Sequence, residues 1–381
     1  MAADRLRYLA EKFPAVVILG PRQIGKTTLA RQVFSHLPYV DLEEPRTREL
    51  FQEDATFQLE QRAKNGIVLD EAQAVPAVFS ALRGLIDRDR HHNGRFIVLG
   101  SVQPAMVRGV SESLAGRAGL LELEGLTAVE AASAAAPFPV DELWLRGGFP
   151  DALQGDFRQW HEPYLRLLIE RDLPQLGIAA DPLFVRRLLT MLAHQQGGLL
   201  NVQSLCNALD VSHAKITRLL DIFEQTFLLR RLQPWFANVG KRLTKAPKVY
   251  LRDTGMLHHL LGIGTLAQLD SHPIRGESWE SFVINDLLAR EHLVHPHSQA
   301  YFWRTAVGAE IDLLLDRGDQ MLAVEIKAGR GNRNQARHLG DALADVKAQH
   351  GWIADQGEGE EALTPLVSRI GFGEIAKRTA F

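Results

Sequence analysis

The sequence predicts an α/β protein that begins with a parallel β-sheet domain and continues into smaller modules. Three short apolar runs, residues 15–19, 66–69 and 95–99, have the composition of buried parallel strands. Patterns typical of helices separate these runs, as the crossover connections of a parallel sheet require. The length of 381 residues exceeds the size at which one hydrophobic core usually stops growing, so more than one domain is expected.

A phosphate-binding loop follows the first predicted strand. Residues 20–27 read Gly-Pro-Arg-Gln-Ile-Gly-Lys-Thr, which is the pattern of glycine, four residues, then Gly-Lys-Thr. Residues 28–34 carry a helical stripe, so backbone N–H groups and the positive end of a helix would meet at the loop. An ordinary glycine-rich turn is the alternative, but the flanking strand and helix favour an ATP site. The expected nucleotide-binding residues are Gly20, Pro21, Gln23, Gly25, Lys26, Thr27 and Thr28, with Lys26 reaching the β- and γ-phosphates and Thr27 holding Mg²⁺.

The second apolar run ends in two acidic residues, which gives it the form of a Walker B strand. Asp70 follows Lys26 by 44 residues, with a helical pattern between them. We expect Asp70 to hold Mg²⁺ through the water shell of the ion and Glu71 to polarise the attacking water. A strand that ends in Asp-Glu is weak evidence alone, and its position after the loop gives it weight.

Phosphoryl transfer also needs a fixed cation to neutralise the charge that develops on the transferred group. Arg117 stands on a glycine-flanked turn before another apolar strand and is the first candidate. It would act in its own subunit or reach into a neighbouring subunit of a homo-oligomer. A solvated turn arginine is the alternative interpretation, and Arg146 and Arg171 are weaker candidates for the same role.

Several segments, in order along most of the chain, resemble one family, the AAA-like ATPases of bacteria and archaea with an uncharacterised C-terminal domain. The resemblance implies ATP binding and hydrolysis. It also implies that Ser101, at the end of the third strand, senses the γ-phosphate, although a helix N-cap is the other interpretation of this residue. The segments are the phosphate-binding loop, Val-Leu-Asp-Glu-Ala-Gln (68–73), Leu-Gly-Ser (99–101), Ser-Leu-Ala-Gly-Arg (113–117), Arg-Gly-Gly-Phe-Pro (146–150), Glu-Arg-Asp-Leu-Pro (170–174) and Tyr-Leu-Arg-Asp-Thr-Gly (250–255).

The patterns divide the chain into four expected segments. An AAA-type core spans residues 1–125 and a helical lid and linker spans 126–185. A winged helix-turn-helix is expected over 186–265, and a restriction-endonuclease-like α/β domain over 270–381.

The expected winged helix rests on a helix-turn-helix pattern followed by a hairpin. Asn201 can cap the first helix, and Asp210-Val211-Ser212 makes the turn before the second. Residues 211–252 contain nine Lys or Arg against two acids, which is the footprint expected for a DNA phosphate backbone. A winged helix that serves only as a protein contact is the alternative.

The last segment contains a predicted hairpin with carboxylates on one face. A four-residue turn at 317–320 would place Asp312 opposite Glu325 and Glu310 opposite Lys327. Two opposed carboxylates repel each other, and a divalent cation turns that repulsion into affinity. We therefore expect Mg²⁺ between Asp312 and Glu325, with Lys327 positioning a nucleophilic water.

An upstream helix supplies Glu280 as a further expected metal ligand of this site. A helical Glu, a strand Asp and a following Glu-x-Lys resemble the PD-(D/E)xK arrangement of restriction-endonuclease-like folds, and Gln335 matches an accessory position loosely. Because the motif is short, three interpretations stay open. They are a working Mg²⁺-dependent nuclease, an inactive relative that binds nucleic acid, and an amphipathic hairpin with solvated ion pairs.

Composition limits the class of protein. The net charge of −3 gives no global signal for nucleic acid, and the single Cys206 excludes an internal disulfide. The sequence has no run of about 18 apolar residues, so we expect a soluble, cytoplasmic protein without a membrane partner. The leading hypothesis is an ATPase that acts on DNA and either cuts or binds it. The others are a nucleotide-switched regulator that binds a protein partner, and an autonomous nuclease gated by ATP.

Overall fold

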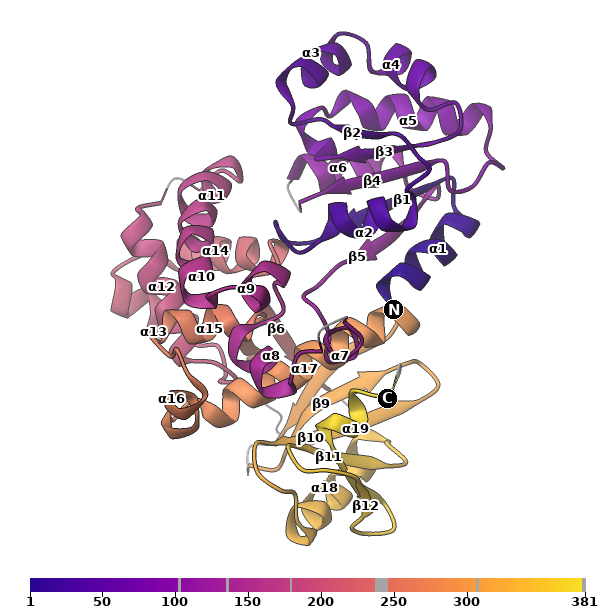
Figure 1. Ribbon diagram of the computed structural model, residues 1–381. Coiled ribbons are helices and arrows are strands. Elements are labelled where there is room, and N and C mark those ends of the chain that lie inside the picture. Colours follow the sequence, from indigo (N-terminus) through magenta and orange to yellow (C-terminus); the bar gives the residue numbers. More distant parts are fainter. Residues whose placement is uncertain (102–103, 135–136, 179, 237–245, 306–307, 379–381) are drawn as a thin grey trace. The chain divides into compact units, whose positions relative to one another are not determined.

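The computed structural model describes residues 1–101, 104–134, 137–178, 180–236, 246–305 and 308–378 (Figure 1). Within it the chain divides into two compact units. Unit 1 is residues 1–124 with the short segment 225–227, and unit 2 is residues 125–224 with 228–381.

Unit 1 is built on a five-stranded sheet whose strands all run parallel. The strand order is β2-β3-β4-β1-β5, so β4 lies between the strand before the phosphate-binding loop and the strand that ends in Asp70. Parallel strands have their C-terminal ends at one edge, and ligands bind at that edge. The strands are β1 (Ala15–Leu19), β2 (Tyr39–Asp41), β3 (Ile67–Asp70), β4 (Phe96–Gly100) and β5 (Ala118–Glu122).

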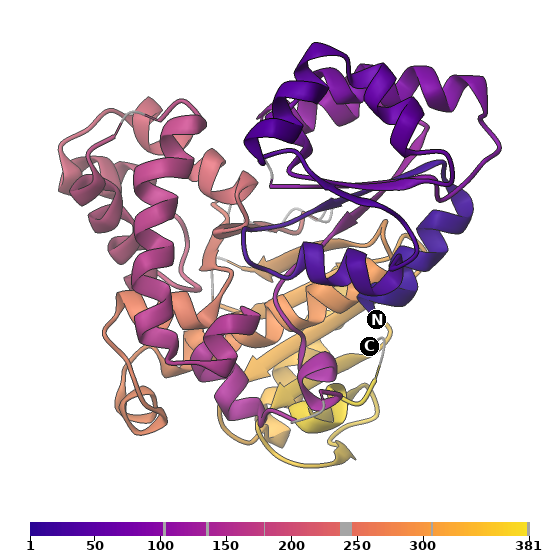
Figure 2. The ribbon, with the colours of Figure 1, turned by 45° about the horizontal axis from the view of Figure 1, so that its top comes forward.

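Helices cover both faces of this sheet, which explains why β1, β3 and β4 are buried along their whole length (Figures 1 and 2). Two helices, α1 and α2, pack on one face, and α3 to α6 pack on the other. The carboxylates of Glu44 and Asp54 cap α3 and α4 by accepting backbone N–H bonds. The helices are α1 (Ala2–Lys12), α2 (Lys26–Val33), α3 (Pro45–Glu53), α4 (Ala55–Arg62), the 3₁₀ turn η1 (Ala72–Ala74), α5 (Ala77–Arg88) and α6 (Pro104–Ser113).

The N-terminal half of unit 2 is helical, and most of its helices share one apolar core. Asn201 caps α13 by accepting the N–H of Ser204, as predicted. Asp210 then adopts the left-handed conformation that turns the chain toward α14. The helices are α7 (Ala128–Ala132), α8 (Val140–Arg146), α9 (Pro150–Gln154), α10 (Phe157–Leu167), the π-helical turn η2 (Leu168–Asp172), α11 (Leu173–Gln175), α12 (Pro182–His194), α13 (Val202–Leu209), α14 (His213–Gln225), α15 (Thr254–Leu260) and α16 (Leu266–Ser271).

Two of the sequence motifs pack against each other in this helical part. A Cβ on Gly147 would lie 2.3 Å from Oδ1 of Asp253, and a Cβ on Gly255 would lie 2.0 Å from the carbonyl oxygen of Arg146. Asp253 also accepts the N–H of Gly148 at 2.8 Å and caps α15. Gly255 therefore allows a backbone contact with Arg146, and Gly147 leaves room for the carboxylate of Asp253.

The strands of unit 2 form a single sheet of the order β12-β13-β11-β10-β9-β8-β6-β7. β6 and β7 form an antiparallel hairpin, and β6 also pairs in parallel with β8, with Gln233 opposite Tyr301. The hairpin expected in the winged helix therefore shares a sheet with the α/β segment that follows it. The strands are β6 (Leu229–Pro234), β7 (Lys248–Leu251), β8 (Gln299–Arg304), β9 (Glu310–Asp316), β10 (Met321–Lys327), β11 (Gly351–Asp355), β12 (Glu360–Ala362) and β13 (Val367–Gly371).

Two long helices cover opposite faces of the central strands of this sheet, α17 (Arg275–Val294) and α18 (Arg333–Val346) (Figure 1). The short helix α19 (Phe372–Ile375) follows β13. No helix in the described ranges combines the length and the apolar composition needed to cross a membrane.

Over residues 313–316 and 321–324 the hairpin of β9 and β10 has the register that the sequence predicted, but the pairing of the described residues does not extend to Asp312 with Glu325 or to Glu310 with Lys327. Asp316 pairs with Met321 and Leu313 pairs with Val324. Leu314 and Ala323 belong to the core that packs against α18, so apolar burial occupies the middle of the face that carries the charged residues. The charged side chains are thereby confined to one end of the two strands.

Candidate functional site

The phosphate-binding loop joins β1 to α2 through two residues in the left-handed conformation, Gln23 (φ 59°) and Gly25 (φ 99°). A Cβ on Gly20 would lie 2.4 Å from the carbonyl oxygen of Leu123, so the loop passes the end of β5 too closely for a side chain. Lys26 begins α2, which leaves the free N–H groups of a helix N-terminus at the C-terminal edge of the sheet.

Lys26 is buried, and its ammonium donates to the carbonyl oxygens of Gly20 at 3.0 Å and Pro21 at 2.7 Å. Burial lowers the pKa of Lys26 to about 8, although the nearby carboxylates of Glu71 and Asp70 oppose this change. Both acceptors are neutral carbonyls, so the positive charge remains available to an anion at the loop.

Asp70 ends β3 and accepts three hydrogen bonds. Thr27 Oγ1 donates to Oδ2 at 2.6 Å, and the Tyr39 hydroxyl donates to the same oxygen at 2.8 Å. Oδ1 accepts the N–H of Glu71 at 2.9 Å. The two expected Mg²⁺ ligands of the phosphate-binding loop are therefore neighbours, and Tyr39 on β2 orients one of them.

Glu71 follows Asp70 in the left-handed conformation, with φ 51°. Its carboxylate accepts a hydrogen bond from the side-chain amide of Gln73. Burial raises the pKa of Glu71, with Lys26 and Arg22 opposing the change. A carboxylate of raised pKa at the end of a strand is suited to accept a proton from water.

Two polar atoms close to this carboxylate are buried without a partner in the part of the chain that the structure describes, Oε1 of Gln73 and Oγ of Ser101. A Cβ on Gly100 would lie 2.4 Å from the Gln73 oxygen, so Gln73 reaches the end of β4. Gly100 in turn pairs with Leu19, the last residue before the loop. The N-cap interpretation of Ser101 finds no hydrogen bond among the described residues. Unpartnered buried polar atoms are costly unless a ligand or water satisfies them.

Unit 2 contains a second candidate site, a cleft of about 1170 Å³ at the charged ends of β9 and β10. Side chains of α17, α18 and β7 complete its walls. Three basic residues line it, Lys248, Arg304 and Lys327. Its seven carboxylates exceed these cations, and they are Glu277, Glu280, Glu310, Asp312, Glu325, Asp341 and Asp345.

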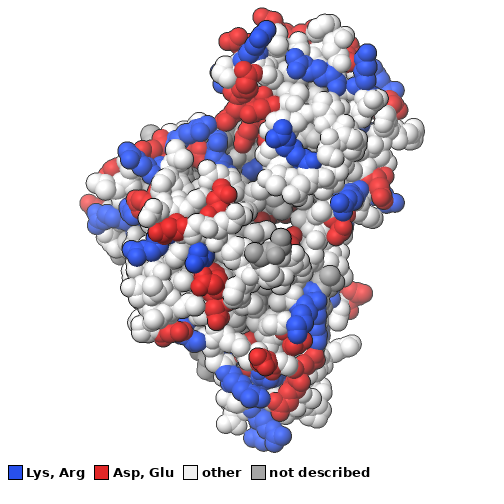
Figure 3. Space-filling view, in the orientation of Figure 1, with Lys and Arg blue, Asp and Glu red and all other residues white. Residues whose placement is uncertain are grey.

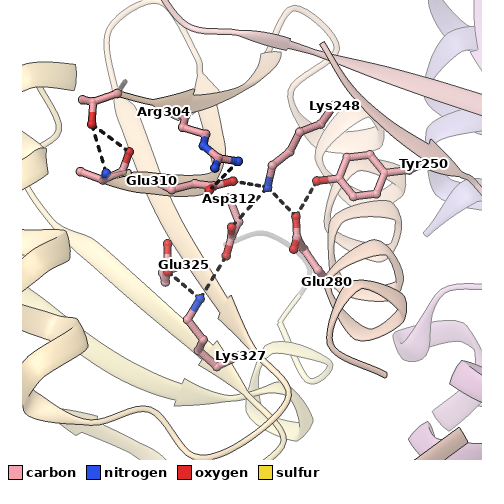
Figure 4. A network of polar contacts seen from close by, with 10 residues as sticks. Lys248, Tyr250, Glu280, Arg304, Glu310, Asp312, Glu325 and Lys327 are labelled. Atoms are coloured by element: carbon pink, nitrogen blue, oxygen red, sulfur yellow. Dashed lines mark hydrogen bonds and ion pairs between the residues drawn. The ribbon is translucent and has the colours of Figure 1, made fainter. Parts of the chain in front are cut away.

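Lys248 of β7 enters this cleft and is almost fully buried there (Figure 4). Its ammonium lies 2.9 Å from Oε1 of Glu280, 2.5 Å from Oε1 of Glu310 and 3.5 Å from Oδ1 of Asp312. Tyr250, two residues along β7, donates its hydroxyl to the same Glu280 oxygen at 2.5 Å. One ammonium thus joins carboxylates from α17 and β9.

Lys327 of β10 contacts the other side of the carboxylate cluster (Figure 4). Its ammonium lies 2.6 Å from Oε1 of Glu325 and 3.7 Å from Oδ2 of Asp312. The same Asp312 oxygen accepts the N–H of Ile326 at 2.8 Å. Oε2 of Glu325 is buried and unpartnered among the described residues.

Burial and mutual repulsion shift the protonation of these groups. Burial, and next the charge of Asp312, raise the pKa of Glu280 to about 7 and that of Glu325 to about 8. Burial alone would lower the pKa of Lys248, but Glu280, Asp312 and Glu310 together raise it above its ordinary value. Burial alone would also lower the pKa of Lys327, but Asp312 and Glu325 raise it above its ordinary value. Both lysines of the cleft are therefore charged, while two of the carboxyl groups can hold protons near neutral pH.

Comparisons with known proteins show which protein families the chain resembles. The AAA domain family matches residues 12–132. Two domains of unknown function follow, DUF8612 over residues 139–267 and DUF4143 over residues 275–370. The uncharacterized proteins Rv2008c of Mycobacterium tuberculosis and Mb2031c of Mycobacterium bovis are each 39% identical to this chain, over 98% of it and 83% of their own length. The chain belongs to their family. Unit 1 of this family member is an AAA-type P-loop ATPase domain.

Solved structures resemble the chain more weakly. The Walker-type ATPase PABY2304 of Pyrococcus abyssi is 16% identical, with a TM-score of 0.46, over 68% of this chain and 94% of that one. ORC1 of Aeropyrum pernix, in complex with DNA, is 14% identical, with a TM-score of 0.32, over 70% and 93%. AMPPCP-bound DnaA of Aquifex aeolicus is 13% identical, with a TM-score of 0.32, over 59% and 86%. Similarity at this level carries no argument about what the chain binds.

The geometry of the AAA-type domain corrects the expectation that Arg117 acts in its own subunit. Arg117 precedes β5 at the N-terminal edge of the sheet, where its carbonyl oxygen accepts the N–H of Ala15. The phosphate-binding loop lies at the other edge, the length of a five-residue strand away, which is roughly 16 Å. Arg117 also makes two bonds of 2.8 Å to the carboxylate of Asp87. Its distance from the loop leaves two of the interpretations open, action in a neighbouring subunit and a solvated turn arginine.

Arg146, one of the two weaker candidates for the cation that neutralises the transferred phosphoryl group, already forms hydrogen bonds within unit 2. It donates to the carboxylate of Glu142, and to the carbonyl oxygens of Leu153 at 3.3 Å and Gly155 at 3.0 Å. Arg171 lies in the π-helical turn of the same unit. Neither residue belongs to the AAA-type domain.

Three of the described basic residues counted over 211–252, Arg230, Arg231 and Lys248, have partners inside unit 2. Arg231 pairs with Asp221 and Glu224, the two acids of that segment. Arg230 donates to Asn285 at 3.0 Å, and Lys248 lies in the carboxylate cleft. Lys241, Arg242 and Lys245 lie outside the described residues. Among the described residues of this segment, Arg230, Arg231 and Lys248 are therefore engaged within the protein rather than presented to a phosphate backbone.

The expected Mg²⁺ site at Glu280, Asp312 and Glu325 does not fit the structure. Lys248 stands between Glu280 and Asp312, and Lys327 stands between Asp312 and Glu325. Within the described residues, no three His, Cys, Asp or Glu side chains converge as metal ligands. Two ammonium groups occupy the space where oxygen ligands would face a cation.

Sequence reasoning missed the residues that long-range contacts bring to each site. Tyr39 contacts Asp70 and Gln73 contacts Glu71 at the end of β3, and Lys248 and Tyr250 both contact Glu280 of the carboxylate cleft. Gln73 lies in a motif that the sequence offered, but its role depends on the end of β4. Gln335 does line the cleft, and it also caps α18 by accepting the N–H of Asn332 at 2.9 Å.

Proposed function

We propose that this protein hydrolyses ATP with Mg²⁺ at the phosphate-binding loop of unit 1. The observation that carries the proposal is the 2.6 Å contact between Thr27 and Asp70, beside the buried ammonium of Lys26. A hydroxyl and a carboxylate at the end of a strand are oxygen ligands that Mg²⁺ takes together with phosphate oxygens. The unpartnered atoms of Gln73 and Ser101 support a bound group at the same edge of the sheet.

Each residue then has a defined task. Lys26 neutralises the β- and γ-phosphates, and the N-terminus of α2 contributes its N–H groups. Thr27 and Asp70 hold Mg²⁺, which supplies further neutralisation of phosphate charge when bound. Glu71 accepts a proton from the attacking water, and Ser101 is positioned to contact the γ-phosphate.

Replacing Glu71 with Gln tests this assignment. We expect ATP hydrolysis to fall by about 10²–10⁴-fold, the scale on which general acid–base groups contribute, while nucleotide affinity stays near the wild-type value. The matched control is Glu49→Gln on the exposed face of α3. Hydrolysis at the wild-type rate in the Glu71 variant would exclude Glu71 as the base.

We also propose that Arg117 acts on the nucleotide of a neighbouring subunit in a homo-oligomer. Asp87 holds the guanidinium on the side of the domain opposite to its own loop, from which a second copy is the reachable target. Mixing Arg117→Ala chains with Lys26→Ala chains tests this role. Partial recovery of turnover supports action in trans, and no recovery opposes it.

A further proposal is that the ATPase acts on DNA through a winged helix and an endonuclease-like domain. The order α12, α13, α14, β6 and β7 supports a winged helix, and His213, Lys215 and Arg218 of α14 are exposed. Lys215 lies over the ring of Phe184, and Arg218 donates to the carbonyl oxygen of Gly177. Glu280 on α17, Asp312 on β9 and Glu325 with Lys327 on β10 support an endonuclease-like arrangement. These features favour a domain that binds DNA without cutting it, because the carboxylates already contact lysines.

Steady-state ATP hydrolysis with and without duplex, single-stranded and branched DNA tests this proposal. We expect DNA to raise turnover, and the DNA to remain intact on a gel afterwards. The double variant Lys215→Ala/Arg218→Ala should lose the stimulation, whereas Arg166→Ala on the exposed side of α10 should keep it. Turnover that ignores every DNA would exclude the proposal.

The charge distribution favours one alternative, a nucleotide-switched regulator that binds a protein. Figure 3 shows Lys and Arg interspersed with Asp and Glu on the face it draws, without a broad basic patch among the described residues there. The cleft of unit 2 is lined by more carboxylates than cations, which repels a phosphate backbone. Indifference to DNA, together with a nucleotide-dependent change in oligomeric state, would select this alternative.

A further inference from the structure

The lysine at the centre of the carboxylate cleft comes from outside the segment in which the sequence placed the cleft. Lys248 belongs to β7, at the end of the eight-stranded sheet, within the region matched by DUF8612. The carboxylates that it contacts belong to α17 and β9, within the region matched by DUF4143. The site is therefore assembled from two successive sequence families.

Lys248 uses the oxygen atoms that a divalent cation would need. Mg²⁺ binds carboxylate oxygens at about 2.1 Å in a near-octahedral shell. Here Oε1 of Glu280 accepts from both Lys248 and Tyr250. Oδ1 of Asp312 faces Lys248, and Oδ2 faces Ile326 N–H and Lys327. Both oxygens of the central carboxylate are thus already paired with cations or donors.

The cluster already contains its own cations. Glu280, Glu310, Asp312 and Glu325 face the ammonium groups of Lys248 and Lys327. The guanidinium of Arg304 lies 3.5 Å from Oε2 of Glu310 as well. Cations that belong to the chain itself therefore offset the cost of burying these carboxylates.

We propose that Lys248 permanently occupies the position that a divalent cation takes in a carboxylate cluster of this kind, and makes the cleft of unit 2 a metal-independent site. The inference rests on the endonuclease-like arrangement proposed above. It explains why that arrangement is present without a group that can activate water. Two consequences follow: the cleft does not bind a divalent cation, and removing the ammonium of Lys248 creates a site that does.

Binding of Mn²⁺ to the full-length, nucleotide-free protein, followed by electron paramagnetic resonance of free Mn²⁺, tests both consequences. Wild type and Asp312→Asn are expected to bind the same amount of Mn²⁺. Lys248→Met is expected to bind an additional ion, and Lys248→Met/Asp312→Asn is expected to lose it. Lys377→Met, at an exposed lysine of unit 2, is the matched control and should bind as wild type does.

Three results would overturn the inference. Wild-type binding of Mn²⁺ that Asp312→Asn abolishes would mean that the cation displaces Lys248. If wild type cuts DNA in a magnesium-dependent way and Asp312→Asn abolishes the cutting, the cation displaces Lys248 as well. A folded Lys248→Met that gains no ion would mean that the carboxylates are not a metal-type cluster, and would remove the endonuclease-like arrangement as well. ATP turnover and its response to DNA, measured on the same variants, report on the proposed function separately.

The comparison stays decisive if Lys248→Met fails to fold. Lys248→Gln keeps a hydrogen-bond donor beside Glu280 and removes the charge, so it is the second variant. The comparison between wild type and Asp312→Asn needs no change at Lys248 at all.

Discussion

The two units each bury a lysine close to acidic residues, but the two lysines have opposite surroundings. Lys26 in unit 1 donates to the carbonyl oxygens of Gly20 and Pro21, and burial lowers its pKa to about 8. Lys248 in unit 2 lies directly against Glu280 and Glu310, and its pKa is raised. The first ammonium has no close carboxylate to neutralise it among the described ion pairs, whereas the second has several.

This difference decides what each lysine can bind. In unit 1, Asp70 is kept occupied by the hydroxyls of Thr27 and Tyr39, so it does not pair with Lys26. A phosphate that reaches the loop therefore meets an unneutralised ammonium and a helix N-terminus. In unit 2 the carboxylates already neutralise the charge of Lys248, so ion pairs hold the cleft together.

The strongest test of the contrast is Lys26→Met. It should reduce ATP hydrolysis by about 10²–10³-fold, because it removes a preorganised charge from the phosphates, and it should leave the fold intact because no buried carboxylate loses its partner. Hydrolysis and nucleotide affinity measured on Lys26→Met and on Lys64→Met, an exposed lysine of the same unit, check this expectation. Equal turnover in the two variants would remove Lys26 from the site.

A smaller effect is expected from pH on the stability of unit 2. Glu280 and Glu325 have an ordinary pKa of 4.5, raised in the folded protein to about 7 and about 8. The folded state therefore binds more protons than the unfolded state between these values. The free energy of unfolding should fall as pH rises from about 4.5 to about 8.

Comparison with a double variant isolates this contribution. The pKa of His258 is lowered by burial to about 4, so it changes stability in the opposite direction below its ordinary value of 6.5. The free energy of unfolding by urea is measured at pH 5, 6, 7 and 8 for wild type and for Glu280→Gln/Glu325→Gln. The contribution of His258 is the same in both proteins, so it cancels when one value is subtracted from the other. The free energy of unfolding of wild type minus that of the variant should fall as pH rises. A value of this difference that does not change with pH would contradict the raised pKa values.

The smallest expected effect comes from Tyr39→Phe. Loss of one hydroxyl donor to Asp70 should cost about 1 kcal/mol, which is typical of a single hydrogen bond. We expect it to appear as a several-fold higher Mg²⁺ requirement for hydrolysis, because Asp70 then turns more freely. Tyr8→Phe, at an exposed ring on α1, is the control. An unchanged Mg²⁺ requirement would mean that Thr27 alone orients Asp70.

The sequence predicted the parts of the molecule that depend on local pattern. The strand, loop and helix around Lys26, the strand that ends in Asp70 and the cap at Asn201 all appear where they were expected. The register of β9 and β10 also appears over residues 313–316 and 321–324, because alternation along two strands joined by a short turn allows few pairings.

The parts that were missed depend on contacts between distant segments. Nothing in the neighbourhood of Lys248 indicates that Glu280, 32 residues later, will share its charge. A count of basic residues assigned that lysine to a DNA surface for the same reason. The sequence did not show that Arg117 lies far from its own loop, because its turn is local, whereas the edge of the sheet on which it lies follows from the pairing of β1 with β5.

The continuous sheet from β12 to β7 also limits how this chain can be recombined with others. A crossover near residue 270, between the two domains of unknown function, would separate β6 from β8 and expose unpaired backbone groups along that edge. The recombined protein would also contain Glu280, Glu310 and Asp312 without Lys248, which neutralises them. A natural or engineered exchange of domains that keeps the cleft intact must therefore transfer β7 together with the C-terminal strands.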